Sequence, residues 1–324
     1  MTPSPDEDTL ASVGEQAVLA RIFPRLPASG AQLLGPGDDA AVLAAPDGRY
    51  VVTTDMMIHG PDFRLAWSTP HDLGWKAAAS NLSDVAAMGA VPTALVVAIA
   101  APSTSPVSLL EGIADGLRDA CQLLAPGCGV VGGDLSVSPT LTIAVTAFGD
   151  LEGRAPVLRS GAHEGDIVAV SGDLGSAALA LRLLFEHAMS DGVPDARLAS
   201  LLRQNTTAQL APSPPIASGR IAALAGATAM LDLSDGLALD AGRLARASGV
   251  RIDFESRLLG ADPELALGGG EDHSLLATFA AGAIIPPEFR RIGICRPGAG
   301  IALDGVHHDA SGWDPYRQWD DTAG

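Results

Sequence analysis

The sequence predicts a mixed α/β (α+β) protein with mixed sheets and two domains that share a cleft. Its 324 residues exceed what one hydrophobic core usually holds, and 47% of them are hydrophobic, which is ample for burial. Strand-like and helix-like segments alternate along both halves. A polar connector over 150–159 separates the halves, so we expect an N-terminal domain over 1–152 and a C-terminal domain over 153–324.

The first half carries clear helix start and stop signals. Thr69 and Pro70 are typical of a helix N-cap and first turn, and Gly89 is typical of a helix end. If the first two strands pair antiparallel, the aspartates at their ends meet at one sheet edge. The elements expected in this half are helices over 14–23, 69–88 and 107–124, and strands over 40–44, 50–54, 91–100 and 141–148.

The second half repeats the alternation. A strand over 166–170 is followed by a glycine-containing turn over 171–175 and then by a helix through Glu186. Prolines over 212–215 interrupt the helical region. A further helix then precedes a strand over 229–232.

The charge balance excludes two common ways of binding phosphate. The formal net charge is -18, whereas nucleic-acid binding needs clustered Lys and Arg, so no nucleic-acid partner is expected. Lys76 is the only lysine, and it lies outside any glycine-rich loop, which excludes a P-loop. If the ligand is a phosphate, metal ions must neutralise its charge.

The cysteines and the N-terminus indicate the compartment. Cys121, Cys128 and Cys295 have no zinc-binding spacing, and an odd number of thiols favours a reducing cytoplasm. Residues 1–10 are polar and acidic and do not resemble a signal peptide. No apolar run reaches membrane-spanning length without Gly, Pro or charge, so no membrane partner is expected.

Acidic residues recur at the ends of predicted strands, in most cases beside glycine, where a backbone can approach a ligand closely. The exception is Asp84, which shares a helix stripe with Ser80 and Lys76. Oxygen-only ligand sets of this kind favour magnesium over zinc. The strand-end segments are Gly37-Asp38-Asp39, Thr53-Thr54-Asp55, Gly132-Gly133-Asp134, Asp232-Leu233-Ser234-Asp235-Gly236 and Gly269-Gly270-Glu271-Asp272.

Each motif also has a structural interpretation. Gly-Asp pairs are ordinary turn residues, and any one of them alone more often forms a turn than a ligand site. Asp232 or Asp235 could cap the helix that starts near Leu237, and Asp173 is interpreted as a turn or cap. Lys76 could pair only with Asp72, four residues earlier on the helix.

Taken together, the motifs resemble the thiamine-monophosphate kinases of the aminoimidazole-ribonucleotide-synthetase superfamily. The resemblance runs from about Gly14 to Trp313, and seven segments occur in the family order. They are Gly37-Asp38-Asp39-Ala40-Ala41-Val42, Thr53-Thr54-Asp55, Asn81-Leu82-Ser83-Asp84-Val85-Ala86-Ala87-Met88-Gly89-Ala90, Val131-Gly132-Gly133-Asp134, Arg159-Ser160-Gly161-Ala162, Asp232-Leu233-Ser234-Asp235-Gly236-Leu237 and Gly269-Gly270-Glu271-Asp272.

The resemblance implies transfer of the γ-phosphoryl group of ATP to thiamine monophosphate, which gives thiamine diphosphate. It implies a homodimer formed by the first domain, with ATP in the groove between domains and several Mg²⁺ ions on the carboxylates. Asp232 and Asp235 would be catalytic, and Gly133, Arg159 and Ser234 would contact the nucleotide. Asp62, Glu271 and Trp313 would face the acceptor. The implied metal ligands are Asp39, Thr53, Thr54, Asp55, Asp84, Asp134, Asp232 and Asp235.

Two departures from the family pattern fall on the acceptor side. Asp62 stands where the family usually has a histidine, while His59 comes three residues earlier, and the stretch over 252–268 is short. Two alternatives therefore remain open. One is a superfamily enzyme with a different phosphorylated acceptor, and the other is a non-catalytic, cation-binding relative.

Overall fold

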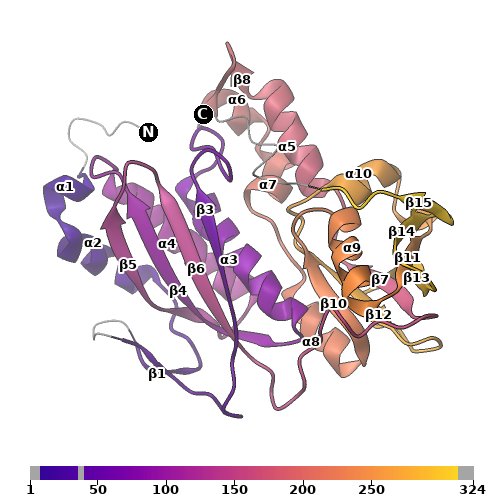
Figure 1. Ribbon diagram of the computed structural model, residues 1–324. Helices are drawn as coiled ribbons and strands as arrows, with labels where there is room; N and C mark the ends of the chain where they lie inside the picture. Colours follow the sequence, from indigo (N-terminus) through magenta and orange to yellow (C-terminus); the bar gives the residue numbers. More distant parts are fainter. Residues whose placement is uncertain (1–7, 36–39, 313–324) are drawn as a thin grey trace.

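The computed structural model describes residues 8–35 and 40–312 and confirms a mixed α/β fold (Figure 1). The strands are β1 (Gln32–Leu34), β2 (Val42–Leu43), β3 (Val51–Ile58), β4 (Val91–Ala101), β5 (Gly129–Val137), β6 (Thr142–Asp150), β7 (Ile167–Ser171), β8 (Met189–Ser190), β9 (Val193–Pro194), β10 (Ala227–Leu233), β11 (Arg251–Phe254), β12 (Ser274–Phe279), β13 (Arg290–Arg296), β14 (Gly300–Leu303) and β15 (Val306–His308). The helices are α1 (Leu10–Val13), α2 (Glu15–Ile22), α3 (Pro70–Ala87), α4 (Val107–Leu124), α5 (Ser176–His187), α6 (Ala196–Leu201), α7 (Arg203–Leu210), α8 (Ile216–Leu224), α9 (Leu237–Ser248) and α10 (Pro263–Gly268), with 3₁₀ turns at Phe23–Arg25 and Ser256–Leu258.

The first sheet has four strands in the order β3-β6-β4-β5. The pairs β3–β6 and β6–β4 are antiparallel, whereas β4 and β5 are parallel and are joined by the crossover helix α4. β3 and β5 are therefore the two opposite edges of this sheet. That separation decides which of the predicted ligands can meet within one chain.

Helix α3 forms as the sequence predicts and packs closely on α4. The Thr69 side chain caps the helix and exchanges hydrogen bonds with Asp72 in a capping box. A Cβ on Gly74 would lie 1.9 Å from the carbonyl oxygen of Ile113, and one on Gly116 would lie 2.0 Å from that of His71. Glycine at these two positions therefore allows the helix backbones to touch.

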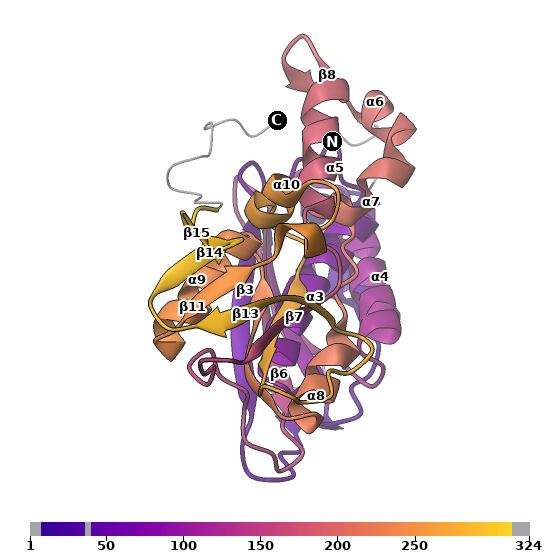
Figure 2. The ribbon, with the colours of Figure 1, turned by 90° about the vertical axis from the view of Figure 1, so that its right-hand side faces the viewer.

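Helices cover one face of the four-stranded sheet and leave the other face exposed. α3 contacts β3, β4 and β6, and Figure 2 shows α3 and α4 together on one side of these strands. On the opposite face of β3, Val52 is 60% exposed and Met56 is 57% exposed. Alternation along the strand turns Met57 into the core instead. An apolar sheet surface is thus open to solvent.

The second sheet has seven strands in the order β10-β12-β7-β13-β11-β14-β15, and of these pairs only β11–β14 is parallel. Its first strand in the sequence, β7, begins at Ile167, and the last strand of the first sheet ends at Asp150. The predicted division at 152/153 lies in the connector between them. At the end of β10, Leu233 pairs with Ser274, which brings 232–236 beside 270–273.

A helical arm made of α5, α6 and α7 with the small β8–β9 ribbon stands above both sheets (Figure 1). Its apolar core includes Leu184, Ala199 and Leu210, and Trp67 joins it from the loop before α3. Arg203 of α7 binds the buried carboxylate of Asp72 with two guanidinium nitrogens. The predicted pairing of Lys76 with Asp72 is therefore wrong, because Arg203 occupies Asp72 and Lys76 reaches across the cleft to Glu271.

Two other expectations about the strands are also wrong. β2 pairs with β1 and β3 pairs with β6, so pairing of the first two predicted strands does not bring their aspartates together. Gly133 and Asp134 lie inside β5, rather than in a turn after it. Gly-Gly resembles a turn in the sequence, but a Cβ on Gly133 would lie 1.9 Å from the carbonyl oxygen of Val97, so glycine is needed within this strand.

Candidate active site

Carboxylates from both sheets approach one another around the C-terminal part of α3. Thr53 of β3 donates a hydrogen bond from Oγ1 to Oδ2 of Asp84 at 2.9 Å. Next to it, the backbone N–H of Asp55 donates to Oδ1 of Asn81 on α3 at 3.0 Å. From the other side, Oδ2 of Asp232 accepts a hydrogen bond from Ser83 Oγ at 3.4 Å. α3 thus joins the end of β10 to the edge strand β3.

Burial and mutual repulsion together make it costly to ionise this group. Burial, followed by the charges of Asp232 and Asp55, raises the pKa of Asp84 to about 7. Burial also raises the pKa of Asp55, with Asp232 and Asp235 adding to the effect and His273 opposing it. A divalent cation would relieve this repulsion and allow all of these carboxylates to ionise together. The oxygen-only donor set therefore fits magnesium.

Asp232 is held in its ionised form by a neighbouring histidine. Burial acts to raise its pKa, but the hydrogen bond and positive charge of His273 outweigh burial and hold the pKa below the ordinary value. His273 Nδ1 lies 3.5 Å from Asp232 Oδ2. The positive charge of Arg159, an exposed residue in the connector between the sheets, also lowers the pKa of Asp232, but more weakly. Arg159 therefore lies near the carboxylates.

Asp235 is held by an arginine. Arg243 on α9 contacts Oδ2 of Asp235 at 2.7 Å and Oδ1 of Asp240 at 2.6 Å. Gly236 occupies the N-cap of α9 and no side chain caps that helix within the described chain, so the capping alternative for Asp232 and Asp235 is wrong. Asp173 does not cap α5 either, because Asp272 accepts the N–H groups of Gly175 and Ala177 there.

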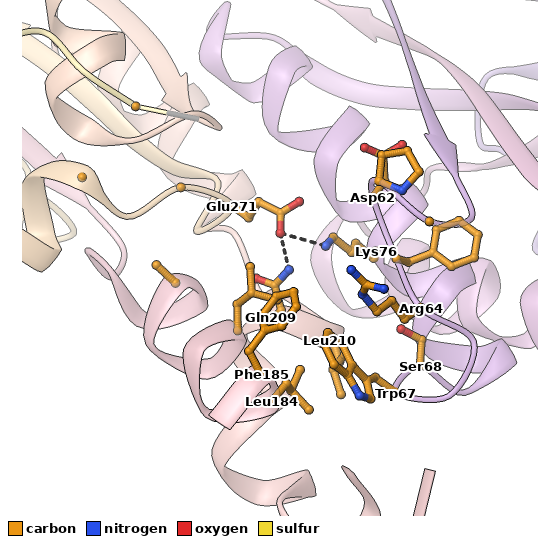
Figure 3. Close-up of a pocket in the computed structure, with 18 of the residues that line it drawn as sticks. Asp62, Arg64, Trp67, Ser68, Lys76, Leu184, Phe185, Gln209, Leu210 and Glu271 are labelled. Atoms are coloured by element: carbon orange, nitrogen blue, oxygen red, sulfur yellow. Dashed lines mark hydrogen bonds and ion pairs between the residues drawn. The ribbon is translucent and has the colours of Figure 1, made fainter. Parts of the chain in front are cut away.

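A cavity of about 550 Å³ opens beside the N-terminal part of α3. Its apolar wall includes Trp67, Phe185 and Leu210, whereas Asp62, Arg64, Lys76, Gln209 and Glu271 supply polar groups (Figure 3). The Arg64 guanidinium lies 5.3 Å from the ring centres of both Trp67 and Phe185. A cavity that is mostly apolar with a few convergent polar groups is typical of a site for an organic ligand.

Glu271 is fixed at the mouth of this cavity. Its Oε2 lies 3.0 Å from Lys76 Nζ and also accepts a hydrogen bond from the amide nitrogen of Gln209. Burial acts to raise the pKa of Glu271, but the charge of Lys76 and the bond from Gln209 outweigh it and lower the pKa. A Cβ on Gly270 would lie 2.7 Å from the carbonyl oxygen of Ser234, so glycine lets this segment pass closely over the end of β10.

The loop with Asp62 contributes to the cavity wall, as its predicted role on the acceptor side requires. Oδ2 of Asp62 accepts a hydrogen bond from the backbone N–H of Ile58 at 2.6 Å, and this bond closes the turn. Burial raises the pKa of Asp62, and the charge of Glu271 adds to this effect. His59 packs on Phe63, with ring centres 5.6 Å apart, and is not among the residues described as lining the cavity.

The predicted ligands are brought together only in part. Asp55, Asp84, Asp232 and Asp235 interact electrostatically, and Ser234 and Glu271 lie on adjoining segments. Thr54 points to the other face of β3, where its Oγ1 donates to the carbonyl of Val145. Gly133 and the exposed Asp134 lie on the opposite edge strand. Asp39 and Trp313 lie outside the described residues.

Among residues 8–35 and 40–312, no three His, Cys, Asp or Glu side chains lie close enough together to hold a metal ion. The carboxylates that do meet therefore form an incomplete set. A metal ion bound here would need further ligands from water, from residues outside the described part, from a bound phosphate or from a second chain.

Sequence reasoning missed the residues that build the cavity. Gln209, Trp67 and Phe185 belong to no motif, and they come together only when the helical arm packs against the loop before α3. His273 follows the acidic Glu271-Asp272 pair directly and has a positive φ of 51°, and no spacing rule linked it to Asp232.

The metal-free protein is expected to lose stability as the pH rises. The folded pKa of Asp84 is about 7, against an ordinary value of 3.8, so its protonated form stabilises the fold below about pH 4. That contribution is lost as the pH rises through about 7. Thermal unfolding in chelator across this range measures the effect, and Asp84→Asn should flatten the slope. An unchanged slope in the variant would contradict the assignment of the repulsion to Asp84.

The fold defines a class of proteins that carry an AIR synthase related domain. The family model of the AIR synthase related protein, N-terminal domain, matches residues 37–151. The E. coli hydrogenase maturation protein HypE has the same fold, with a TM-score of 0.68 at 20% identity over 93% of this chain and 98% of that chain.

The particular family follows from closer relatives. The thiamine-monophosphate kinase of Mycobacterium tuberculosis is 41% identical over 97% of this chain and 93% of its own length. The crystal structure of thiamine-monophosphate kinase from Stenotrophomonas maltophilia matches with a TM-score of 0.74 and 32% identity, covering 90% of this chain and 96% of that chain. The structure of AaThiL complexed with AMPPCP and TMP matches with a TM-score of 0.73 and 30% identity, covering 95% of this chain and 99% of that chain. The chain belongs to the thiamine-monophosphate kinase family.

Proposed function

We propose that this chain, as a member of that family, transfers the γ-phosphoryl group of ATP to the phosphate of thiamine monophosphate and so gives thiamine diphosphate. The observation that carries the proposal is the arrangement along α3. The carboxylate group with Asp84 lies at one end of the helix, and the cavity for an organic ligand with Lys76 lies at the other. A phosphorylated organic acceptor fits this arrangement.

The acceptor phosphate needs no dedicated base. Its second pKa is about 6, so most of it is dianionic at neutral pH. The obstacle to reaction is the repulsion between two polyanions. Magnesium bound by Asp55, Asp84 and Asp232, with Asp39 and Asp235 as further ligands, would neutralise this charge. Arg159 and Ser234 hold the nucleotide beside these carboxylates, and they align it with the acceptor.

The cavity suits the thiamine part of the acceptor. Glu271 presents a carboxylate with a lowered pKa to the cationic ring system, and Lys76 and Gln209 fix its orientation. Trp67 and Phe185 provide apolar surface for the rings. Trp313 is proposed to stack on the ligand from the C-terminal segment, on the basis of the family resemblance alone.

We place Asp134 in the active site of a second copy. Asp55 and Asp134 lie on opposite edge strands, three strand spacings or about 14 Å apart, so one chain cannot bring them together. The open apolar face with Val52 and Met56 is suited to burial against the same sheet of another protomer. A homodimer would then complete each site with Asp134 and Gly133 of the other chain.

The chain is also proposed to have two domains and a cytoplasmic location. The division into domains 1–152 and 153–324 is supported by the two separate sheets. A cytoplasmic location is supported by the three cysteines, which are all free and buried thiols.

One observation favours a second candidate, a different phosphorylated acceptor. Asp62 adds a carboxylate to the cavity, and such a group would repel an anionic substrate part placed near it. Steady-state turnover of a panel of phosphate esters with ATP separates the candidates. Thiamine monophosphate should have the highest kcat/KM. A higher kcat/KM for another ester would identify that ester as the substrate instead.

ATP binding is expected to depend on magnesium. The described acidic site has Arg159 as its candidate nucleotide cation, and a single arginine cannot neutralise a triphosphate among several carboxylates. Titration calorimetry with and without excess chelator measures this. ATP affinity should fall by at least about 100-fold in chelator. Undiminished affinity would show that the carboxylates do not act through a metal.

A further inference from the structure

The side chain of Gln209 on α7 presents a buried acceptor for which residues 8–35 and 40–312 supply no donor. Gln209 is only 6% exposed and is part of the cavity wall. Its amide nitrogen donates to Oε2 of Glu271, whereas its buried amide oxygen, Oε1, has no hydrogen-bond partner in the described part of the chain. A buried acceptor without a partner is costly, and in a ligand cavity it indicates a donor on the ligand.

The orientation of this amide is fixed by its neighbour. An ionised carboxylate only accepts hydrogen bonds, so the NH₂ group of Gln209 must face Glu271 and the oxygen must face away from it. Lys76 lies 3.0 Å from the same carboxylate oxygen and keeps Glu271 in place (Figure 3). The site is therefore preorganised to accept one hydrogen bond.

The position of Gln209 indicates which part of the acceptor it contacts. Lys76 and Asp84 are eight residues apart on α3, so their Cα atoms lie about 12 Å apart along the helix axis. An acceptor that directs its phosphate to the carboxylates around Asp84 must extend its other end toward Lys76, Glu271 and Gln209. In thiamine monophosphate, that other end is the aminopyrimidine ring, whose exocyclic amine is a hydrogen-bond donor.

We propose that Gln209 is a specificity-determining residue whose Oε1 accepts a hydrogen bond from the exocyclic amine of the acceptor's pyrimidine ring. This inference rests on the proposed function. It predicts discrimination against an acceptor that has hydrogen in place of that amine, because such an acceptor leaves the buried Oε1 unpaired. Sites built to hydrogen-bond a substrate group reject analogues that lack it.

The test compares thiamine monophosphate with its desamino analogue on three proteins. The wild type should prefer thiamine monophosphate by about 10- to 100-fold in kcat/KM, mostly through KM. Gln209→Met keeps the volume but removes the acceptor, and it should reduce the preference to within about threefold. Gln204→Met makes the same change at an exposed position of α7 and should keep the wild-type preference.

Three results would overturn the inference. Equal turnover of both compounds by the wild type would mean that water satisfies Oε1, and the proposed function would survive. A Gln209→Met variant that loses activity equally on both compounds would show that Gln209 only supports Glu271. Turnover of neither compound by the wild type would overturn the proposed function and this inference with it. If Gln209→Met does not fold, the wild-type ratio still decides between the first result and the expected one.

Discussion

Replacing Asp84 by asparagine is expected to lower kcat by about 10²–10³-fold while leaving the fold intact. The substitution keeps the shape and the hydrogen bond from Thr53 but removes one of the charges that would hold magnesium. Its stability should not fall, because the raised pKa of Asp84 means that its ionised form is destabilising at neutral pH. Steady-state kinetics at saturating magnesium, together with thermal unfolding, measure both effects.

Asp232→Asn should lose a similar factor in kcat, but it should also destabilise the protein because it removes the partner of buried His273. Asp191→Asn, at an exposed turn, provides the matched control and should leave kcat unchanged. Activity within about tenfold of the wild type in Asp84→Asn would reduce that residue to a structural role.

Two inactive variants are expected to restore each other's activity when they share a dimer. If each site combines Asp84 of one chain with Asp134 of the other, a heterodimer of Asp84→Asn and Asp134→Asn contains one intact site and one doubly altered site. Co-expression with two affinity tags isolates this heterodimer. Its turnover should rise from near zero to about half that of the wild-type dimer.

The matched control is the heterodimer of Asp84→Asn and Asp232→Asn. Both residues belong to the carboxylate group of one chain, so neither of its sites is intact and it should stay inactive. An inactive Asp84→Asn/Asp134→Asn heterodimer would contradict the shared site. A monomeric wild-type protein in sedimentation analysis would contradict the proposed homodimer as a whole.

Local signals predicted the elements on which the site is built. Thr69 and Pro70 indicate where α3 starts, and Gly89 follows its end, so the helix that carries Asp84 was predicted within a residue or two. The strand ends at Asp55 and Asp232 were less well defined, since β3 continues to Ile58. The family resemblance, rather than spacing, indicated that these distant segments act together.

Long-range pairing explains what the sequence could not predict. The pairing of β3 with β6, and of Asp72 with Arg203, depends on elements far apart in the chain. Gly133 resembles a turn residue but serves close strand approach. Gln209 has no local signature, because its orphan acceptor exists only once α7 and the segment around Glu271 have met across the cavity.

Identification of the product that the purified protein forms from ATP, magnesium and thiamine monophosphate tests phosphoryl transfer directly. Phosphorus NMR distinguishes a new diphosphate from free phosphate in the same sample. Because the carboxylate group and the cavity are expected to align the acceptor phosphate with the γ-phosphoryl group, thiamine diphosphate and ADP should appear in equal amounts. Release of inorganic phosphate without thiamine diphosphate, or no consumption of ATP, would contradict phosphoryl transfer between these two ligands at this site.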